Sequence, residues 1–537
     1  MINSKDLKPQ DISKPIEQLT KIEKLMDLPA PYDKPGMEPD FHEPKAEWVE
    51  KYCANLDGII GIDTFERPKT KEEEQELVKK FLSGMEKMLS DETNKGIIQP
   101  LLLSLEYCAK CHTCSEACHI FEATGGHELY RPIYRSEVLR RLVKKYFTPS
   151  GKLFGSLVGA DVDLTWETVA RLGELAYRCN LCRRCAQTCP LGLDNGIIAR
   201  EIRKIFSQEM GIAPKPLHEN GTVKQLATGS STGMNKAAFM DIMEFHGEDI
   251  EEMVGVSYDV PIDKEGADIL LVHNAGEFMA WPENPIAFTI IMQEAGLNWT
   301  LSSDYIGYDS VNYGLFYDDG QARKVALKQQ EVAKKLGVKK IVVAECGHAH
   351  KAYALTSDRM MSAESRVPVE SFLPLLRDIV LSGKLDLDPM RNNFPVTLHD
   401  PCNMVRQMGI VEPQRDILKA ICPQFREMTP HGVDNYCCGG GSGFAIMNSM
   451  NFHDFLNKVS TRKKWSQVLN AFQDTASDPS IPKYVCAPCS NCKGAMRDIY
   501  KFYKATDKFN FQYGGIVELV VNAMTKFDKP FLEFLHE

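Results

Sequence analysis

Three features that would narrow the function are missing from this sequence of 537 residues. No stretch reaches the roughly 18 to 20 consecutive apolar residues that a membrane-spanning helix needs. The first residues, MINSKDLKPQ, lack the apolar core of a secretory signal, so a cytoplasmic protein is expected. A basic excess is also missing: 63 Lys and Arg stand against 73 Asp and Glu, a net charge of −10, which argues against nucleic-acid binding.

What is present is an ordinary globular composition, with 43% hydrophobic and 25% charged residues. At roughly 150 residues per domain, the length predicts three or four domains. The first segment, 1–95, is charged and contains many prolines early on, and KEEEQELVKKFLSGMEKML within it predicts an exposed amphipathic helix. We interpret this segment as an N-terminal arm that docks a partner.

The remaining chain divides by pattern into four segments. Helix-like stretches around two cysteine runs indicate an all-α domain at 96–215, and a polar connector follows at 216–265. From 266 on, strands alternate with helices, which favours parallel sheets with right-handed crossovers. ADILLVHNAG and VKKIVVAECG predict strands, and the helix ARKVALKQQEVAKKLG between them is expected to end at Gly337. The fold class predicted is therefore a multidomain α+β protein.

The α/β part is expected to be an internal duplication, with one copy at 266–385 and the other at 386–537. Three short pieces recur in the same order. LLVHNAG matches VTLHDPC, Asn312-Tyr313-Gly314 matches Cys437-Cys438-Gly439, and AECGHA matches APCSNC. The first copy is degenerate, because Cys346 is the one cysteine that it keeps.

Seventeen cysteines are the most informative part of the composition. A chain of this length buries its own core and needs no disulfides, so clustered cysteines in the cytosol favour metal binding. Cys53 and Cys422 stand apart and are interpreted as buried thiols, while Cys346 is either a relic or part of a site. The other fourteen form three groups: 108–118, 179–189, and Cys402 with Cys437, Cys438, Cys486, Cys489 and Cys492.

The first two groups are CAKCHTCSEACH and CNLCRRCAQTCP, which share one spacing. A C-x2-C-x2-C-x3-C run holds a cubane [4Fe-4S] cluster, and its fourth cysteine binds the neighbouring cluster. Zinc, the alternative, prefers paired CxxC motifs or mixed Cys and His ligands. His119 stands where proline is usual, and this removes no ligand. The crossover assigns Cys108, Cys111, Cys114 and Cys189 to cluster 1, and Cys118, Cys179, Cys182 and Cys185 to cluster 2.

The third group contains two adjacent cysteines, Cys437 and Cys438, followed by three glycines. A single cube cannot easily use both thiolates from one backbone step, whereas a larger or distorted cluster can. The glycines let the main chain approach such a cluster closely.

The pattern C…CCG…CxxC resembles the CCG domain of heterodisulfide reductases. Two ferredoxin-like runs before a duplicated CCG region resemble the catalytic subunit of the membrane-bound enzyme, HdrD, and AECGHAH most resembles the DsrK subunits of DsrMKJOP complexes. The resemblance covers about residues 100 to 500. It implies a catalytic non-cubane [4Fe-4S] cluster held by Cys402, Cys437, Cys438, Cys489 and Cys492 and lined by Gly439 and Gly440. Cys486 or Cys346 could replace one of these ligands.

The same resemblance implies an enzyme on the inner face of the cytoplasmic membrane, attached through partner subunits. A DsrM-like cytochrome b would oxidise menaquinol, and electrons would pass through two cubane clusters to the non-cubane cluster. The expected substrate is the trisulfide or disulfide of the protein DsrC in dissimilatory sulfur metabolism, including sulfate reduction. An alternative is an electron-relay subunit of a flavoprotein 2-hydroxyacid or glycerol-3-phosphate dehydrogenase. A purely conducting adaptor is a third interpretation.

Three histidines stand near the predicted cluster ligands in the sequence. His348 and His350 could supply protons there, because histidine titrates close to neutrality. Ordinary polar residues at the end of a strand are an equally good interpretation of both. His399 is expected only to cap a turn.

Overall fold

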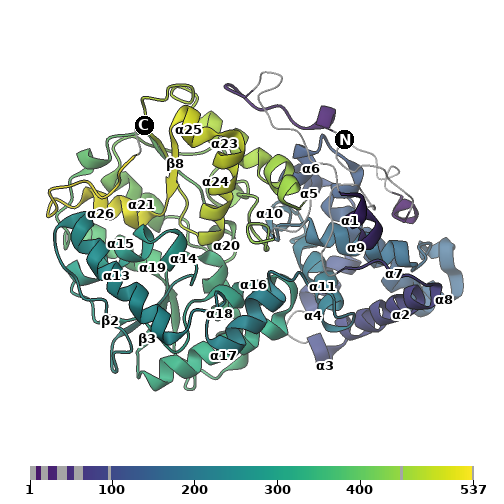
Figure 1. Cartoon of the computed structure of the whole chain (residues 1–537). Coiled ribbons are helices and arrows are strands. Elements are labelled where there is room, and N and C mark those ends of the chain that lie inside the picture. Colours follow the sequence, from purple (N-terminus) through teal and green to yellow (C-terminus); the bar gives the residue numbers. More distant parts are fainter. Residues whose placement is uncertain are drawn as a thin grey trace.

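The computed structural model describes residues 8–13, 22–32, 45–53, 65–94, 98–447 and 452–534. The chain forms two lobes side by side: a helical lobe from its first part and an α/β lobe from the rest (Figure 1). Part of the expected arm at 1–95 lies outside the described residues. Among the described residues, no helix has both the length and the apolar character needed to cross a bilayer.

The helical lobe packs its long helices around one apolar core. The helices predicted from PIYRSEVLRRLVKKYF and TWETVARLGELAYR are confirmed as α7 and α9. The helices of this lobe are α1 (Ala46–Lys51), α2 (Lys71–Met88), α3 (Asp91–Asn94), α4 (Ile98–Glu106), α5 (Thr113–Glu116), α6 (His119–Ala123), α7 (Pro132–Phe147), α8 (Pro149–Phe154), α9 (Trp166–Tyr177), α10 (Arg184–Gln187) and α11 (Asn195–Gln208).

Helix α2 confirms the amphipathic helix predicted in the arm but corrects its exposure. A capping box starts it, because Thr70 accepts a hydrogen bond from the amide of Glu73 and Glu73 accepts one from Thr70. Its apolar face is buried, and a Cβ added at Gly84 would lie 2.5 Å from Cγ2 of Ile205 on α11. The apolar face of α2 therefore packs on the helical lobe itself.

The α/β lobe contains two four-stranded parallel sheets, which confirms the predicted α+β class. The first has the order β2-β1-β3-β4 and the second the order β6-β5-β7-β8. If the strands of each sheet are numbered along the chain, both sheets have the order second, first, third, fourth. The strands are β1 (Ile269–Val272), β2 (Trp299–Thr300), β3 (Lys340–Val343), β4 (Val369–Ser371), β5 (Val396–Leu398), β6 (Phe425–Arg426), β7 (Lys483–Cys486) and β8 (Phe511–Gly514).

Helices connect successive strands in both sheets, as expected for a duplicated fold. Helix α17 ends at Lys335, and Gly337 follows it with φ +66°, as the sequence predicts. The helices of this lobe are α14 (Glu277–Ala280), α15 (Glu283–Glu294), α16 (Asp309–Tyr317), α17 (Asp319–Lys335), α18 (Gly347–Met360), α19 (Phe372–Leu381), α20 (Cys402–Val405), α21 (Pro413–Ile421), α22 (Phe452–Phe455), α23 (Arg462–Ala471), α24 (Ser490–Tyr503), α25 (Ala505–Phe509) and α26 (Ile516–Ala523).

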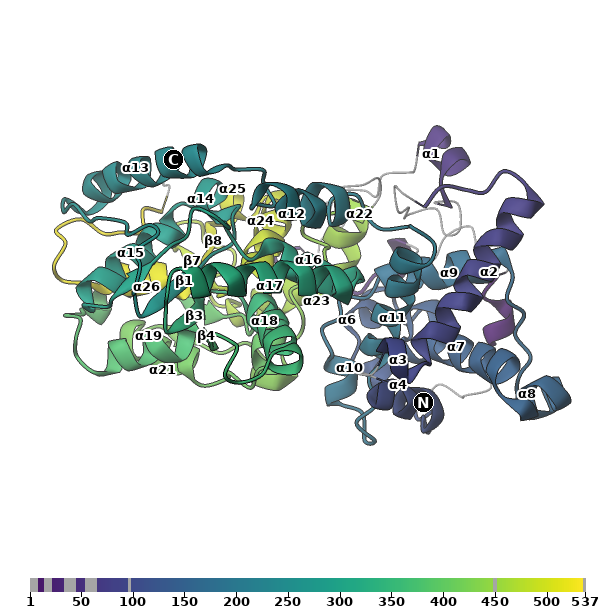
Figure 2. The same ribbon diagram turned by 90° about the horizontal axis from the view of Figure 1, so that it is seen from below.

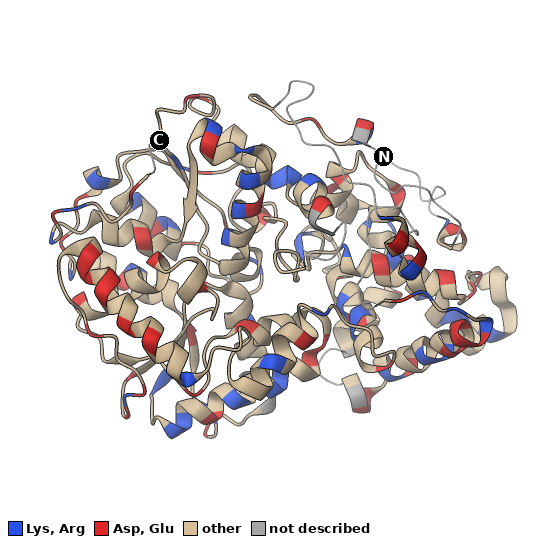
Figure 3. Cartoon of the chain, viewed as in Figure 1, with Lys and Arg blue, Asp and Glu red and all other residues tan. Residues whose placement is uncertain are grey.

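The segment 216–265, expected to be a polar connector, contains the π-helix η7 (His218–Val223) and two α-helices, α12 (Lys224–Thr228) and the longer α13 (Lys236–Val254). Helix α13 buries Phe239, Met243 and Ile250 in the core of the α/β lobe. These residues recur at helical spacing, so one face is apolar although the segment as a whole is polar. Figure 2 shows α13 on one side of the α/β lobe and α19 and α21 on the other, and Figure 3 shows acidic residues along the outer face of α13.

A buried ion pair fixes the loop in front of Cys437 to the end of β5. Both guanidinium Nη atoms of Arg415 bond to Asp400, at 2.7 and 2.6 Å, and the Gly432 amide donates to the same carboxylate at 2.6 Å. The side chains of Asp400 and Arg415 are 0% and 4% exposed. Breaking a buried pair by removing one partner leaves an uncompensated charge.

We expect Asp400→Ala to lower the free energy of unfolding by about 3 kcal/mol, because Arg415 loses its fully buried partner and keeps only Glu427, which is 27% exposed. The matched control is Asp474→Ala, which removes an exposed partner of Arg426 and should cost no more than about 1 kcal/mol. Denaturant titration of both variants measures the difference. Equal losses would contradict the role assigned to Asp400.

Candidate metal centres

The two ferredoxin-like runs adopt the same unusual backbone. Lys110 and His112 in the first run have φ of 54° and 66°, and Leu181 and Arg183 hold the matching positions in the second with 51° and 61°. Left-handed conformations cost non-glycine residues roughly 1 to 2 kcal/mol each. Such strain persists where the surroundings impose it, typically at functional sites. Two runs with one strained conformation indicate one shared task.

Two cavities in the helical lobe divide the eight cysteines into the sets that the crossover predicts. The first cavity is lined by Cys108, Cys111, Cys114 and Cys189, together with Ile133 and Leu193. The second is lined by Cys118, Cys179, Cys182 and Cys185. In each set, three cysteines come from one run and the fourth from the other.

The third group gathers at the carboxyl ends of two strands of the second sheet. Cys402 begins α20 shortly after β5, and Cys489 is the N-cap of α24 shortly after β7. Cys437 and Cys438 lie on the loop between η9 (Gly432–Asp434) and α22. Ligands commonly bind at this edge of a parallel sheet, where loops from several strands converge. The helix N-termini there also favour thiolates.

The buried thiols of this group form a continuous network. Cys437 contacts both Cys402 and Cys438, and Cys438 contacts Cys492, which contacts Cys489. The amides of Gly439 and Gly440 donate to the sulfurs of Cys437 and Cys438, each at 3.4 Å. Gly439 needs its φ of +90° and lies against the backbone of Ser460, so neither glycine is a loose hinge. The five cysteines that the resemblance names are therefore all together.

A cysteine of the second ferredoxin-like run also joins this network. The thiol of Cys182 lies within hydrogen-bonding reach of Cys437. Cys182 also lines the second cavity of the helical lobe. The cavity assigned to cluster 2 and the thiol group of the α/β lobe are thus direct neighbours, which the sequence does not reveal.

Contacts between the thiols separate their acidities. The hydrogen bond from Cys437 lowers the pKa of Cys402 to about 7, and bonds from Cys346 and Cys492 lower that of Cys489 to about 5. A bond from Cys437 also holds the pKa of Cys438 well below its usual range. The same contacts raise the pKa of Cys437, and burial together with such contacts raises that of Cys492, both well above the usual value. The network thus divides the five thiols into proton donors and thiolates, and thiolates are the form that binds metal.

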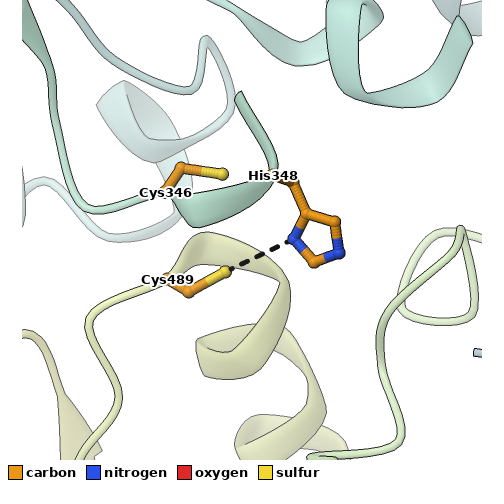
Figure 4. Close-up of side chains that lie close together, drawn as sticks. All are labelled: Cys346, His348 and Cys489. Atoms are coloured by element: carbon orange, nitrogen blue, oxygen red, sulfur yellow. Dashed lines mark hydrogen bonds between the residues drawn. The ribbon is translucent and has the colours of Figure 1, made fainter. Parts of the chain in front are cut away.

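Cys346, left open by the sequence, lies at the same site as Cys489. It caps α18 after β3 just as Cys489 caps α24 after β7, and the two side chains lie close together (Figure 4). The Nδ1 atom of His348 lies 3.8 Å from Cys489 Sγ, and ligand atoms of all three residues lie within 4.8 Å of one another. The first copy of the fold therefore contributes a wall to the site of the second copy.

Cys486 lies elsewhere, although it shares the CxxCxxC stretch. It packs with Cys422 in a different apolar core from that of Cys489 and Cys492. Side chains on a strand alternate between the two faces of a sheet, and Cys486 is the last residue of β7. The structure thus brings Cys489 and Cys492 to the third group and leaves Cys486 outside it.

His399, expected to cap a turn, is buried beside the thiols instead. Its ring and the sulfurs of Cys438 and Cys492 lie within 4.8 Å of one another. Its place at the end of β5, just before Asp400, is a signal that could have indicated this, because residues there line the carboxyl edge of the sheet. The sequence interpretation also missed Lys464, which is fully buried on α23 and whose surroundings include Cys438 and Cys437.

Side chains from each lobe satisfy the backbone of the other. Asn180, next to Cys179, donates to the Gly439 carbonyl at 2.7 Å, and its Oδ1 accepts from Ser460 at 3.0 Å and bonds to His119 at 2.8 Å. Arg406 donates to the Cys182 carbonyl at 2.8 Å and to two carbonyls before Cys437. His119, the departure from the usual proline, is part of this junction.

The charges around the thiols fit anionic iron–sulfur clusters. Lys464, Arg203 and Arg406 bond to carbonyl, amide, hydroxyl or thioether groups, and none forms an ion pair with a described residue. Burial lowers the pKa of Lys464 to about 7 and that of Arg203 to about 10. A buried cation without a counter-charge is costly, and a cluster held by thiolates carries net negative charge. The donor set and its surroundings therefore fit such clusters.

We expect Gly439→Ala to reduce the iron content by about four atoms per chain, the content of one [4Fe-4S] cluster. An added Cβ would lie 2.5 Å from the Ser460 carbonyl oxygen and force the Cys437–Cys438 loop to move. Gly383→Ala is the control, because Gly383 also has a positive φ of 72° but faces open space. Iron analysis that shows the same iron content in both variants would contradict this role.

Cys492→Ser should likewise lose about four irons, whereas Cys486→Ser should keep the wild-type content of about twelve, three clusters of four irons each. The reason is their placement on opposite sides of the second sheet. Iron analysis and the electron paramagnetic resonance spectrum of the oxidised protein measure both. Loss of iron in the Cys486 variant would mean that the cysteines exchange roles.

Two family models match the chain. A 4Fe-4S dicluster domain matches residues 104–193 and a cysteine-rich domain, CCG, matches residues 396–497. They cover the two cavities of the helical lobe and the second copy of the α/β fold, which places iron–sulfur clusters in this protein.

Curated relatives are similar over most of the chain. The "Hdr-like menaquinol oxidoreductase iron-sulfur subunit 2" of Archaeoglobus fulgidus is 26% identical over 80% of this chain and 81% of its own. The corresponding protein of Archaeoglobus profundus is 26% identical over 63% of this chain and 67% of its own. The D chain of the dihydromethanophenazine:CoB–CoM heterodisulfide reductase of Methanosarcina barkeri is 24% identical over 65% and 81%. The chain is thus similar to heterodisulfide reductase-like iron–sulfur subunits.

Proposed function

We propose that this chain is the iron–sulfur electron-transfer subunit of a membrane-associated, heterodisulfide reductase-like menaquinol oxidoreductase. One observation carries the proposal: the Cys182 thiol, in the cavity assigned to cluster 2, contacts Cys437 of the third thiol group. An electron route and a sulfur-rich site thereby meet inside one chain. The similarity to menaquinol oxidoreductase subunits supports the choice of donor.

The reaction at the third thiol group is cleavage of a sulfur–sulfur bond. A disulfide takes up two electrons and two protons and gives two thiols, and a trisulfide takes up four of each and gives two thiols and hydrogen sulfide. Each menaquinol oxidised releases two electrons and two protons. We propose the disulfide or trisulfide of DsrC as substrate and a DsrM-like cytochrome b as the electron donor.

The ligand sets proposed are those of the sequence analysis, with Cys108, Cys111, Cys114 and Cys189 around cluster 1 and Cys118, Cys179, Cys182 and Cys185 around cluster 2. Cys402, Cys437, Cys438, Cys489 and Cys492 would hold the non-cubane cluster. When bound, the clusters supply one-electron redox chemistry.

The protein's own residues supply burial, a positive charge and ring nitrogens around the third thiol group. Burial of the third thiol group excludes water, since Cys437 and Cys489 are 0% exposed. Lys464 stands close enough to balance negative charge at Cys438. His399 and His348 place ring nitrogens beside the sulfurs, where protons must be delivered to the leaving thiols. Access of a protein substrate to this site would require an extended arm rather than a folded surface.

Cys437→Ser should abolish substrate turnover and leave reduction of the two cubane clusters by dithionite intact, because Cys437 lies in the third thiol group and lines neither cavity of the helical lobe. Substrate turnover is measured with reduced methyl viologen and a disulfide substrate. Reduction of the two cubane clusters is measured from the spectrum of the dithionite-reduced protein. An adaptor or flavoprotein relay would keep electron transfer in this variant, and such a result would sink the proposed catalytic role.

A further inference from the structure

The cavity assigned to cluster 1 opens at the surface of the helical lobe. Of the seventeen cysteines, all within the described residues, Cys111 is the only one that is exposed. The cavity assigned to cluster 2 lies inward of it, because its cysteine Cys182 contacts the buried Cys437. An electron from an outside donor therefore reaches the first cavity before the second.

Exposed apolar side chains stand next to residues that line this cavity, and one of them lines it. Leu103 and Tyr107 are 49% and 62% exposed and lie one helical turn apart at the end of α4, directly before Cys108. Leu191, 53% exposed, follows Cys189 and lines the same cavity. We call Leu103, Tyr107 and Leu191 the apolar rim. Exposed apolar groups gathered around one opening are typical of interaction sites.

Hydrogen bonds from neighbouring segments fix the backbone around the apolar rim. Arg140 donates to the carbonyl groups of Ser104 and Leu105, which fixes the end of α4. The Ser104 hydroxyl accepts a hydrogen bond from the Asp194 amide at 3.0 Å, which ties α4 to the loop that carries Leu191. Binding of a partner here requires little ordering of loops. The binding free energy from the apolar contact is therefore not reduced by that entropic cost.

The charged residues that flank Tyr107 in the sequence are of opposite sign. Glu106 and Lys110 are exposed on either side of Tyr107, and Lys110 forms an ion pair with Glu137 at 2.7 Å. A soluble carrier that binds briefly is usually steered by one strong sign of charge. A mainly apolar rim with balanced charges instead matches the core of a lasting subunit interface.

We propose that the apolar rim is the docking site of the electron-donating membrane subunit, with its redox group held against the cavity of Cys111. The contact is apolar and lasting, so the donor is a fixed subunit and not a soluble charged carrier. This inference rests on the proposed function, and it adds the surface, the entry point and the order in which the two cavities are used.

The same lobe offers a matched control surface. Leu153, Phe154 and Leu157 are 76%, 52% and 87% exposed on α8 and the turn after it, and they line neither cysteine cavity. This patch has comparable exposed apolar character without a thiol beneath it. If apolar exposure alone attracted the donor, α8 would serve equally well.

The experiment compares wild type, Leu103→Glu/Tyr107→Glu, whose residues line neither cysteine cavity, and Leu153→Glu/Leu157→Glu, each tagged and expressed in a host that makes the complete complex. Membranes are solubilised and the chain is purified in about 0.5 M salt, where exposed charge pairs are screened. Haem absorbance per chain measures the bound cytochrome. We expect the rim variant to retain at least ten-fold less haem than wild type and the α8 variant to match wild type.

A second measurement locates the redox group. A water-soluble dysprosium chelate should speed the spin relaxation of one reduced cluster in the isolated wild-type chain, and this effect should disappear in the complex. Iron content and turnover with reduced methyl viologen should be unchanged in the rim variant, which shows that the chain is folded and loaded.

The outcomes separate the two proposals. Haem retained by the rim variant, or lost equally from the α8 variant, overturns the docking site while the proposed function stands. Haem that leaves wild type at high salt overturns the lasting apolar contact. A wild-type chain that carries no haem-containing partner but holds a flavoprotein overturns the menaquinol route, and the docking of a membrane donor with it.

Discussion

The contact between the second ferredoxin-like run and the glycine loop after Cys438 is the constraint on which the rest depends. Both segments have backbone groups that no helix or strand satisfies, and buried carbonyls need hydrogen-bond donors. Asn180, Arg203 and Arg406 supply them across the lobe boundary. Because these donors reach specific carbonyls, they fix Cys182 beside Cys437, and the proposed one-electron route depends on that proximity.

The duplicated fold explains how one site is assembled from two copies. The strand orders of the two sheets are the same, and equivalent helices begin at Cys346 and at Cys489. The second copy keeps the cysteines, while the first supplies Cys346 and His348 opposite them. This wall of the site carries one thiol and one imidazole beside Cys489.

Electrostatics links this site to the acidic chain that surrounds it. The net charge is −10, yet Lys464 and Arg203 are fully buried beside thiols with neutral partners. A buried cation is stabilised where an anion lies near it, and Asp400 as well as the thiols Cys438 and Cys437 acts on Lys464 in this way. Thiolate-bound clusters provide such an anion as well, so folding of the junction and loading with iron are expected to be coupled.

The sequence alone determined the chemistry and most of the framework. The spacing of Cys108, Cys111 and Cys114, repeated at Cys179, predicts ligands because it is local, and periodicity places α7, α9 and β1 for the same reason. Tertiary structure decided which cysteines meet. Cys486 and Cys489 are three residues apart but lie on opposite sides of a sheet, whereas Cys182 and Cys437 meet although far apart in the chain. Spacing records neighbours along the backbone, and only packing brings distant thiols to one point.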